Sequence, residues 1–178
     1  GLSALFISFS GLAALWAFVF QLAPTFGVDA NAAENVLTAA LVVSGAAGLT
    51  AAFLGDKFGR VKPLAIGMLL AICGVAAFHW GGDFGPYLAG VVLTGGLWNF
   101  PMAYQMGMIA TSDERGNIAV LMPAALAIGG ALGPILAGAL LSGGHGYAPL
   151  YGLFAGATAI GLAAFIVMGR RLASEARA

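Results

Sequence analysis

The chain has 178 residues, of which 61% are hydrophobic and 8% are charged, and its formal net charge at pH 7 is zero. A soluble domain carries about 25% charged residues and a disordered chain is poor in apolar ones, so the composition excludes both classes. Without a basic block nucleic acid is not an expected partner, and with one cysteine neither a disulfide nor a cysteine-based metal site is expected.

Six uncharged runs predict membrane-spanning helices, because a helix needs about 20 apolar residues to cross the hydrocarbon core. In chain order they are 2–26, 36–54, 63–80, 86–110, 118–142 and 149–169, followed by a tail at 170–178. Every charged residue lies outside these runs, as expected if an ionised side chain at mid-bilayer costs about 2.5 kcal/mol or more. The sequence therefore predicts an all-α polytopic membrane protein made of a single bundle of six transmembrane helices.

Spans one and four each hold an aromatic stretch near the middle. The stretches are Leu15-Trp16-Ala17-Phe18 and Leu97-Trp98-Asn99-Phe100, and a glutamine follows each of them, Gln21 or Gln105. Two such stretches three spans apart suit a 3+3 inverted repeat, because an odd offset reverses the orientation of a span. Chance similarity in an apolar chain is the alternative.

The basic residues predict the orientation in the membrane. All of them lie on one face of the predicted bundle: Lys57, Arg60, Lys62, Arg115, Arg170, Arg171 and Arg177. The positive-inside rule assigns this face to the cytoplasm, so both termini are expected inside, in the cytoplasmic (inner) membrane. An interfacial aromatic belt is expected at the opposite face, from Trp80, Phe84, Tyr87, Tyr147 and Tyr151.

Span five carries two rows of small residues at four-residue spacing. One row is Gly129, Gly133 and Ala137, and the other is Gly130, Pro134 and Gly138. Small residues let helix backbones approach closely in lipid, so we expect this span to pack tightly against a neighbour.

The loop after span two is the most specific stretch of the chain. Residues 54–63, Leu-Gly-Asp-Lys-Phe-Gly-Arg-Val-Lys-Pro, place one acid and three bases between two hydrophobic helices, with a glycine for a tight turn. At Leu54, Asp56, Lys57, Gly59 and Arg60 the loop resembles the major facilitator superfamily signature Gly-x-Leu-Ala-Asp-Arg-x-Gly-Arg-Arg/Lys. Ala52 replaces its leading glycine and Val61 its second base, departures that are common in the second half of that family.

The segment 113–117, Asp-Glu-Arg-Gly-Asn, followed by the glycine-rich 129–134, also resembles that second half. The resemblance implies helices seven to twelve of a twelve-helix fold, and hence transport of a small solute by alternating access. Because the chain opens on Gly1, we expect it to be part of a longer protein. Its expected partners are membrane lipid, the solute, and a missing N-terminal six-helix half or a second copy.

The resemblance also implies roles for particular residues. Leu54, Asp56, Lys57, Gly59 and Arg60 would form a gating motif whose ion pairs and helix-end contacts hold the outward-facing state. The alternative role of these residues, and in particular of Lys57 and Lys62, is to enforce the topology. Asp56 would further gain from a nearby helix N-terminus.

The first and fourth helices of each half line the central cavity in that family. The candidate cavity residues are Trp16, Phe20, Gln21, Trp98, Asn99, Tyr104 and Gln105, with Asn99 the strongest. Aromatic walls with few hydrogen-bonding groups suit a small, partly apolar or neutral polar solute. Helix–helix hydrogen bonding and core packing are the alternative roles for these residues.

The alternatives to a transporter are an intramembrane enzyme and a non-transporting membrane protein. An intramembrane enzyme is disfavoured, because no paired carboxylates, histidine cluster or nucleophile–base set lies within the spans. A non-transporting membrane scaffold or assembly protein remains the alternative to a transporter. No cofactor or metal is expected.

Overall fold

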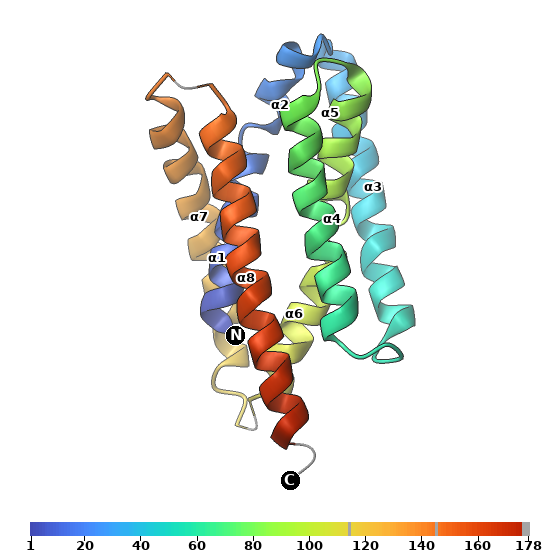
Figure 1. Cartoon of the computed structure of the whole chain (residues 1–178), viewed down its shortest axis with the longest axis vertical. Coiled ribbons are helices and arrows are strands. Elements are labelled where there is room, and N and C mark those ends of the chain that lie inside the picture. Colours follow the sequence, from blue (N-terminus) through green and yellow to red (C-terminus); the bar gives the residue numbers. More distant parts are fainter. Residues whose placement is uncertain (114, 145, 176–178) are drawn as a thin grey trace.

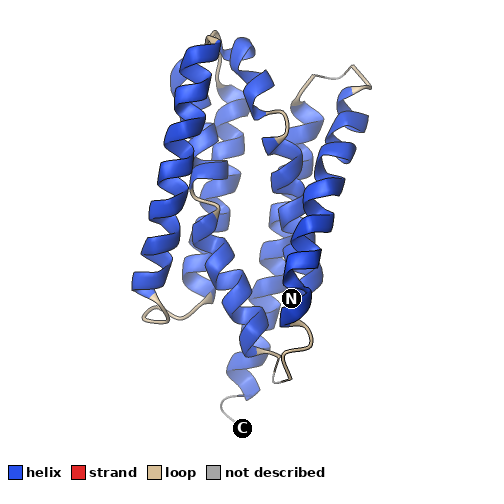
Figure 2. Cartoon of the chain, turned by 180° about the vertical axis from the view of Figure 1, so that it is seen from behind, coloured by secondary structure: helices blue, strands red, loops and turns tan. Residues whose placement is uncertain are grey.

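The computed structural model describes residues 1–113, 115–144 and 146–175, and this part of the chain is helical without a strand (Figures 1 and 2). Glu114 and Arg177, which entered the sequence predictions, lie outside the described residues, as does the side chain of Trp80. The helices, in chain order, are α1 (Leu2–Trp16), α2 (Val19–Leu22), the 3₁₀ helix η1 (Ala23–Phe26), α3 (Ala30–Leu54), α4 (Val61–Trp80), α5 (Phe84–Val91), the π-helix η2 (Val92–Gly96), α6 (Asn99–Thr111), the 3₁₀ helix η3 (Ala119–Leu121), α7 (Met122–Leu141) and α8 (Ala148–Glu175).

Helices occupy all six uncharged runs, but two of their bounds differ from the prediction by more than two residues. α3 begins six residues before the predicted residue 36, because Asp29 caps it by accepting a hydrogen bond from the Ala32 amide at 2.9 Å. α8 continues to Glu175, through most of the predicted tail. Charged residues stop a hydrophobic run at the membrane surface, but they do not stop a helix.

Four helical stretches in the described part of the chain are long and apolar enough to cross a membrane. They are Ala30–Leu54, Val61–His79, Ala119–Leu141 and Ala148–Ser174. The pair Leu2–Trp16 and Val19–Phe26, bent by 47°, counts as a fifth if it is one broken span. The fourth predicted run, 86–110, is divided among α5, η2 and α6.

The helices pack in two groups, visible side by side in Figure 1. In one group α1 packs against α7 and α8, and in the other α3 and α4 both pack against η2 and α6. Contacts between α4 and α8 join the two groups. α1 begins and α8 ends at the end of the bundle that also carries the loops α3–α4 and α6–η3 (Figure 1), so the basic loops share one end.

The buried apolar residues form two clusters, one toward each end of the bundle. One of them contains most of the aromatic residues expected in an interfacial belt. Tyr87 is fully buried and donates a hydrogen bond to the Val19 carbonyl at 3.2 Å, and Tyr151 stacks on Phe78 with ring centroids 5.8 Å apart. The belt prediction is wrong for Tyr87, because Val19 of α2, Phe26 of η1 and Phe78 of α4 surround its side chain. Tyr151 is half-buried, and its place in the belt stays a prediction.

Candidate functional site

Two helix breaks meet in the middle of the bundle. The first lies between α1 and α2 at Ala17 and Phe18, and the second lies between η2 and α6 at Leu97 and Trp98. Each break falls within one of the two aromatic stretches of the sequence. Trp16, the last residue of α1, lies against Gly95 of η2 so closely that a Cβ atom on Gly95 would overlap the indole.

Proline explains the second break. A proline lacks the amide hydrogen that bonds to the carbonyl four residues earlier, and its ring clashes there. Pro101 therefore cannot continue an α-helix through Leu97, and α6 begins two residues before it. The preceding turn widens into the π-helix η2, a geometry common at functional sites. The first break consists of Ala17 and Phe18, neither of which breaks a helix by itself. We therefore attribute this break to tertiary packing.

The two breaks border a space that we call the tryptophan recess. Its volume is about 230 Å³ and it is lined by Phe9, Leu12, Ala13, Trp16, Leu41, Gly95 and Trp98. No charged side chain belongs to this lining, and its only polar side-chain atoms are the two indole nitrogens. The recess therefore suits the apolar or neutral part of a ligand.

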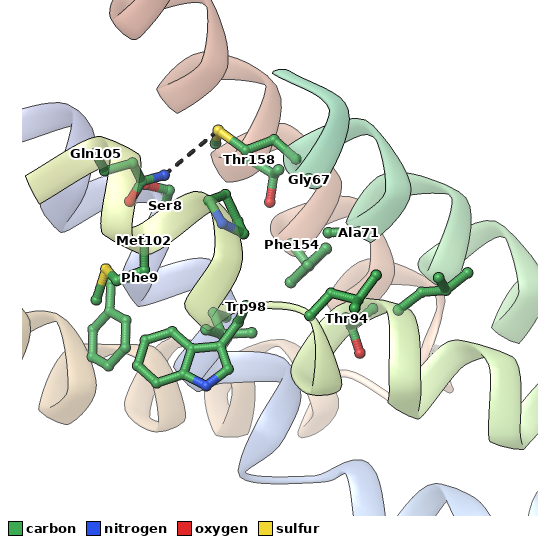
Figure 3. Close-up of a pocket in the computed structure, with 15 residues that line it drawn as sticks. Ser8, Phe9, Gly67, Ala71, Thr94, Trp98, Met102, Gln105, Phe154 and Thr158 are labelled. Carbon is green, nitrogen blue, oxygen red and sulfur yellow. Dashed lines mark hydrogen bonds between the residues drawn. The ribbon is translucent and has the colours of Figure 1, made fainter. Parts of the chain in front are cut away.

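A second space, the glutamine cavity, lies among α1, α4, α6 and α8 (Figure 3). It holds about 50 Å³, enough for a few water molecules. The residues lining it are Ser8, Phe9, Leu12, Gly67, Met68, Ala71, Leu93, Thr94, Leu97, Trp98, Pro101, Met102, Gln105, Phe154 and Thr158. Phe9, Leu12 and Trp98 line both spaces, so the two are adjacent.

Gln105 is the cavity's largest polar side chain and is only 5% exposed. Among the described residues its amide makes one hydrogen bond, from Nε2 to the Met68 sulfur at 3.5 Å (Figure 3). A thioether is a weak acceptor, whereas a primary amide offers two donors and an acceptor. By contrast, Ser8 and Thr94 donate to carbonyls of their own helices at 2.6 and 2.7 Å.

Asn99, the strongest sequence candidate, lines neither space. Its Nδ2 donates to Ser44 Oγ at 2.8 Å and to the Ser44 carbonyl at 3.3 Å, which joins α6 to α3. This is the helix–helix hydrogen bonding that the sequence left open as the alternative role.

The remaining cavity candidates are scattered. Phe20 and Gln21 lie on α2, beyond the first break; Phe20 is 42% exposed and the Gln21 carbonyl accepts a hydrogen bond from Tyr147 at 3.2 Å. Tyr104 lines a different pocket, of about 250 Å³, together with Asp56 and Arg60. Its hydroxyl is buried and has no hydrogen-bond partner among the described residues.

The signature loop joins α3 to α4 and reaches across to α6. Arg60 makes a forked ion pair with Asp56, from Nε to Oδ1 at 2.7 Å and from Nη2 to Oδ2 at 2.8 Å. Its third nitrogen, Nη1, donates to the Gly107 carbonyl at 2.9 Å and to the Thr111 hydroxyl, both in the last turns of α6. A guanidinium at the negative end of a helix dipole is favourable. Arg60 thus fastens the loop to the end of α6.

The other motif residues form the turn around this pair. Leu54 is the last residue of α3, Lys57 is exposed, and Gly59 has φ of +68°, a conformation that favours glycine. The hydrogen bonds from Arg60, ahead of its charge, hold the pKa of the Asp56 carboxyl below its ordinary value. The same hydrogen bonds raise the pKa of Arg60. Asp56 is therefore ionised at neutral pH.

Asp113, like Asp29, is a carboxylate at the start of a helix. Its Oδ2 accepts hydrogen bonds from the amides of Ile118 and Ala119 at 2.6 and 2.7 Å, where η3 leads into α7. Asp56 instead follows the C-terminal end of α3.

The two small-residue rows of α7 differ in their surroundings. Gly129 and Gly133 face α1, where a Cβ on Gly133 would lie 2.5 Å from the Ser10 carbonyl oxygen, and Ala137 is fully buried. In the other row Gly130 touches only the edge of Phe9, Pro134 is half-buried, and Gly138 faces open space.

Sequence reasoning missed several lining residues. Phe9, Ser8 and Thr158 have no distinctive sequence context in an apolar chain, since single hydroxyl and aromatic residues recur throughout it. Gly95 carried a usable signal, because two adjacent glycines shortly before a proline weaken a helix.

These features define an integral membrane protein built of apolar helices, with an uncharged recess between two broken helices. The family model of the Major Facilitator Superfamily matches residues 1–177, and the chain belongs to this family. The match confirms the resemblance seen in the loop motif. No curated protein and no solved structure matches the chain. The family transports small solutes across membranes, which is consistent with the expectation of a non-enzyme and does not favour the scaffold alternative.

Proposed function

We propose that this chain is the C-terminal six-helix half, helices seven to twelve, of a carrier that moves a small uncharged solute by alternating access. The observation that carries the proposal is the meeting of two broken helices at Trp16 and Gly95, beside a recess without charge. Carriers commonly bind substrate near the bilayer midplane, between discontinuous helices in corresponding positions of two repeats.

The packing of the helices supports six spans in a 3+3 inverted repeat. In this arrangement α1–α2–η1, α3 and α4 form one repeat, and α5–η2–α6, η3–α7 and α8 form the other. Span one packs against spans five and six, and span four packs against spans two and three. Exchanging the two repeats turns one set of contacts into the other, as an inverted repeat requires.

The signature loop supports a gating role. Arg60 and Asp56 couple the α3–α4 loop to the end of α6, the same broken span that carries Trp98. A movement of α6 that shifts Gly107 and Thr111 therefore breaks the Arg60 contacts. In the proposed carrier this contact holds one of the two alternating states. The loop faces the cytoplasm in this proposal, with both termini on the same side of the inner membrane.

The complete carrier needs a second bundle of six helices. The tryptophan recess opens between α1, α3 and η2, and hydrophobic side chains such as Leu41, 68% exposed, stand at its edge. We propose that the N-terminal half, or a second copy of this chain, covers this face and completes the solute site.

A transport assay tests the proposal. Cells expressing the full-length protein would be supplied with a panel of radiolabelled uncharged solutes, to find one whose flux depends on the protein. Trp16→Ala and Trp98→Ala are then expected to lower that flux about tenfold, as the loss of a well-packed aromatic contact predicts. Phe53→Ala is the matched control, because Phe53 lies on the outer surface of α3 and is 80% exposed. Wild-type flux in both tryptophan variants would place the solute elsewhere.

A further inference from the structure

The glutamine cavity has no role in the function proposed above. We propose that it is a second binding subsite, reached past Trp98, that takes a small uncharged hydrogen-bonding group of the solute, such as an amide. This inference rests on the proposed transport function only for the identity of the ligand. Access past Trp98 can be tested without transport.

The tryptophan recess and the glutamine cavity share a wall. Phe9, Leu12 and Trp98 line both the tryptophan recess and the glutamine cavity. The rings of Phe9 and Trp98 lie together in Figure 3, with centroids 5.6 Å apart and planes tilted by 37°. Side chains can change rotamer without any movement of the backbone, so this wall can open while the helices stay in place.

Trp98 belongs to the second helix break. It lies in the turn between η2 and α6, it is half-buried, and its amide reaches the Gly95 carbonyl only at 3.4 Å. A residue in a helical turn of this kind is less constrained than one in a continuous helix. Trp98 is therefore the member of the wall best placed to move.

Each of the two spaces by itself is small for a ligand pocket. The tryptophan recess, about 230 Å³, is smaller than the roughly 300 Å³ at which small-molecule pockets begin. The glutamine cavity alone, about 50 Å³, holds only a few water molecules. When the Trp98 indole turns away, the two volumes and the space of the indole itself become one pocket.

The residues that line the glutamine cavity favour a neutral hydrogen-bonding group. The cavity contains no charged side chain, so an ion would be desolvated there without a partner. Gln105 is buried, and among the described residues its amide makes one hydrogen bond, to the Met68 thioether, which leaves a donor and an acceptor position for a ligand. An amide group complements both positions at once.

The experiment uses cysteine alkylation in the full-length protein, in a background where every native cysteine, Cys73 included, is replaced. Thr158→Cys, which replaces the hydroxyl and drops one methyl group, places a thiol in the wall of the cavity. Iodoacetamide is the neutral amide probe, and iodoacetate is a charged probe of similar size. Both rates are normalised to those of a free thiol. Ser10→Cys is the matched control, because Ser10 is 8% exposed on α1 and lines neither space.

Trp98→Ala is expected to raise the iodoacetamide rate at Thr158→Cys about tenfold and to leave the Ser10→Cys rate unchanged, because only the cavity opens. Iodoacetate is expected to react about tenfold more slowly than iodoacetamide, because a carboxylate is desolvated on entry. Gln105→Leu is expected to slow iodoacetamide several-fold.

An unchanged rate at Thr158→Cys in the Trp98→Ala variant, or an equal acceleration at Ser10→Cys, overturns the role of Trp98. Equal rates for the two probes, or no effect of Gln105→Leu, overturn the assignment of the ligand class. Neither result depends on whether the carrier transports, so this inference and the proposed function fail separately.

Discussion

At the scale of single residues, Gly95 is a position with little freedom to change. The Trp16 indole occupies the space in which any side chain at Gly95 would begin. Few contacts of the chain depend so directly on a missing Cβ, and this one joins the two broken helices. The glycine thus allows the closest approach in the region where the solute is proposed to bind.

Gly95→Ala is expected to destabilise the protein by about 1–3 kcal/mol, because the methyl group must displace the indole or the backbone. Thermal unfolding in detergent measures the effect. Gly45→Ala is the control, since nothing lies within 4 Å of a Cβ there and alanine favours the helix. A Gly95→Ala protein as stable as the Gly45→Ala protein would contradict the contact.

Asp56→Asn is expected to slow transport while expression and membrane insertion stay near normal, because the amide loses the charge that faces Arg60. Flux and surface abundance are measured together. Asp29→Asn serves as a control, since asparagine also caps a helix. Normal transport kinetics in Asp56→Asn would leave the motif with a topological role only.

The Asp56–Arg60 pair also predicts a dependence on pH. The lowered pKa of Asp56 means that the folded protein holds the ionised carboxyl more strongly than the unfolded chain does. The resulting stability is fully present above the ordinary carboxyl pKa and is lost as pH falls through the lowered value. The melting temperatures of wild-type protein and Asp56→Asn should therefore differ by a constant amount from about pH 6 to 8 and converge only in acid. Convergence near neutral pH would contradict the lowered pKa.

At the scale of elements, the fourth span is assembled from three helical pieces that have different neighbours. α5 packs against α4, η2 packs against both α3 and α4, and α6 is fastened to α3 through Asn99 and to the signature loop through Arg60. α6 is therefore held at both ends by side-chain hydrogen bonds, whereas Leu97 and Trp98 in the turn between η2 and α6 make backbone hydrogen bonds alone among the described residues. A movement of the span is expected to concentrate at that turn.

The Asn99–Ser44 contact can be separated from solute binding by a double-mutant cycle. If the two side chains serve only to join α6 to α3, Asn99→Ala and Ser44→Ala should show a coupling of about 1 kcal/mol in thermal unfolding. Solute affinity should change little in either variant. A loss of affinity in Asn99→Ala alone, without coupling, would restore Asn99 as a solute ligand.

At the scale of the whole molecule, one end of the bundle carries the described basic residues, the start of α1 and the end of α8. The other end carries the loops at 27–29, 81–83 and 142–147, without a lysine or arginine. This asymmetry follows from the order of the spans in the sequence, because each successive span reverses direction.

The orientation predicts which loops are accessible from outside the cell. Single cysteines at Gly82 and Ser142 should react with an impermeant maleimide added to intact cells. Cysteines at Lys57 and Gly116 should react only after the membrane is opened. Labelling of the two groups on the same side would contradict six spans, and labelling with the sides exchanged would contradict a cytoplasmic signature loop.

Much of the fold could be predicted from the sequence, because lipid imposes a strict rule on charge. Runs without ions became helices, and the loop motif already carried the family resemblance. Trp16 and Trp98 could be singled out by their repeated aromatic context, and the break before Pro101 has a local cause. Their meeting across the bundle could not be predicted, because it depends on how α1 packs beside η2.

The candidate site was less predictable. Nothing local distinguishes Asn99, which bonds to α3, from Gln105, which lines a cavity: both are amides in the same apolar span. Likewise, the residue types at Ala17 and Phe18 do not predict the first helix break. Which way a polar side chain points is decided by the neighbour it meets.

The sequence by itself determined the class of the protein, the positions of its apolar helices and the end at which its cations gather. These follow from the cost of placing ions in lipid, which acts on each segment alone. Only the tertiary structure decided where the two broken helices meet, what Arg60 fastens and which side chains divide the recess from the cavity. Those features are contacts between segments up to about a hundred residues apart, and segment composition does not encode such contacts.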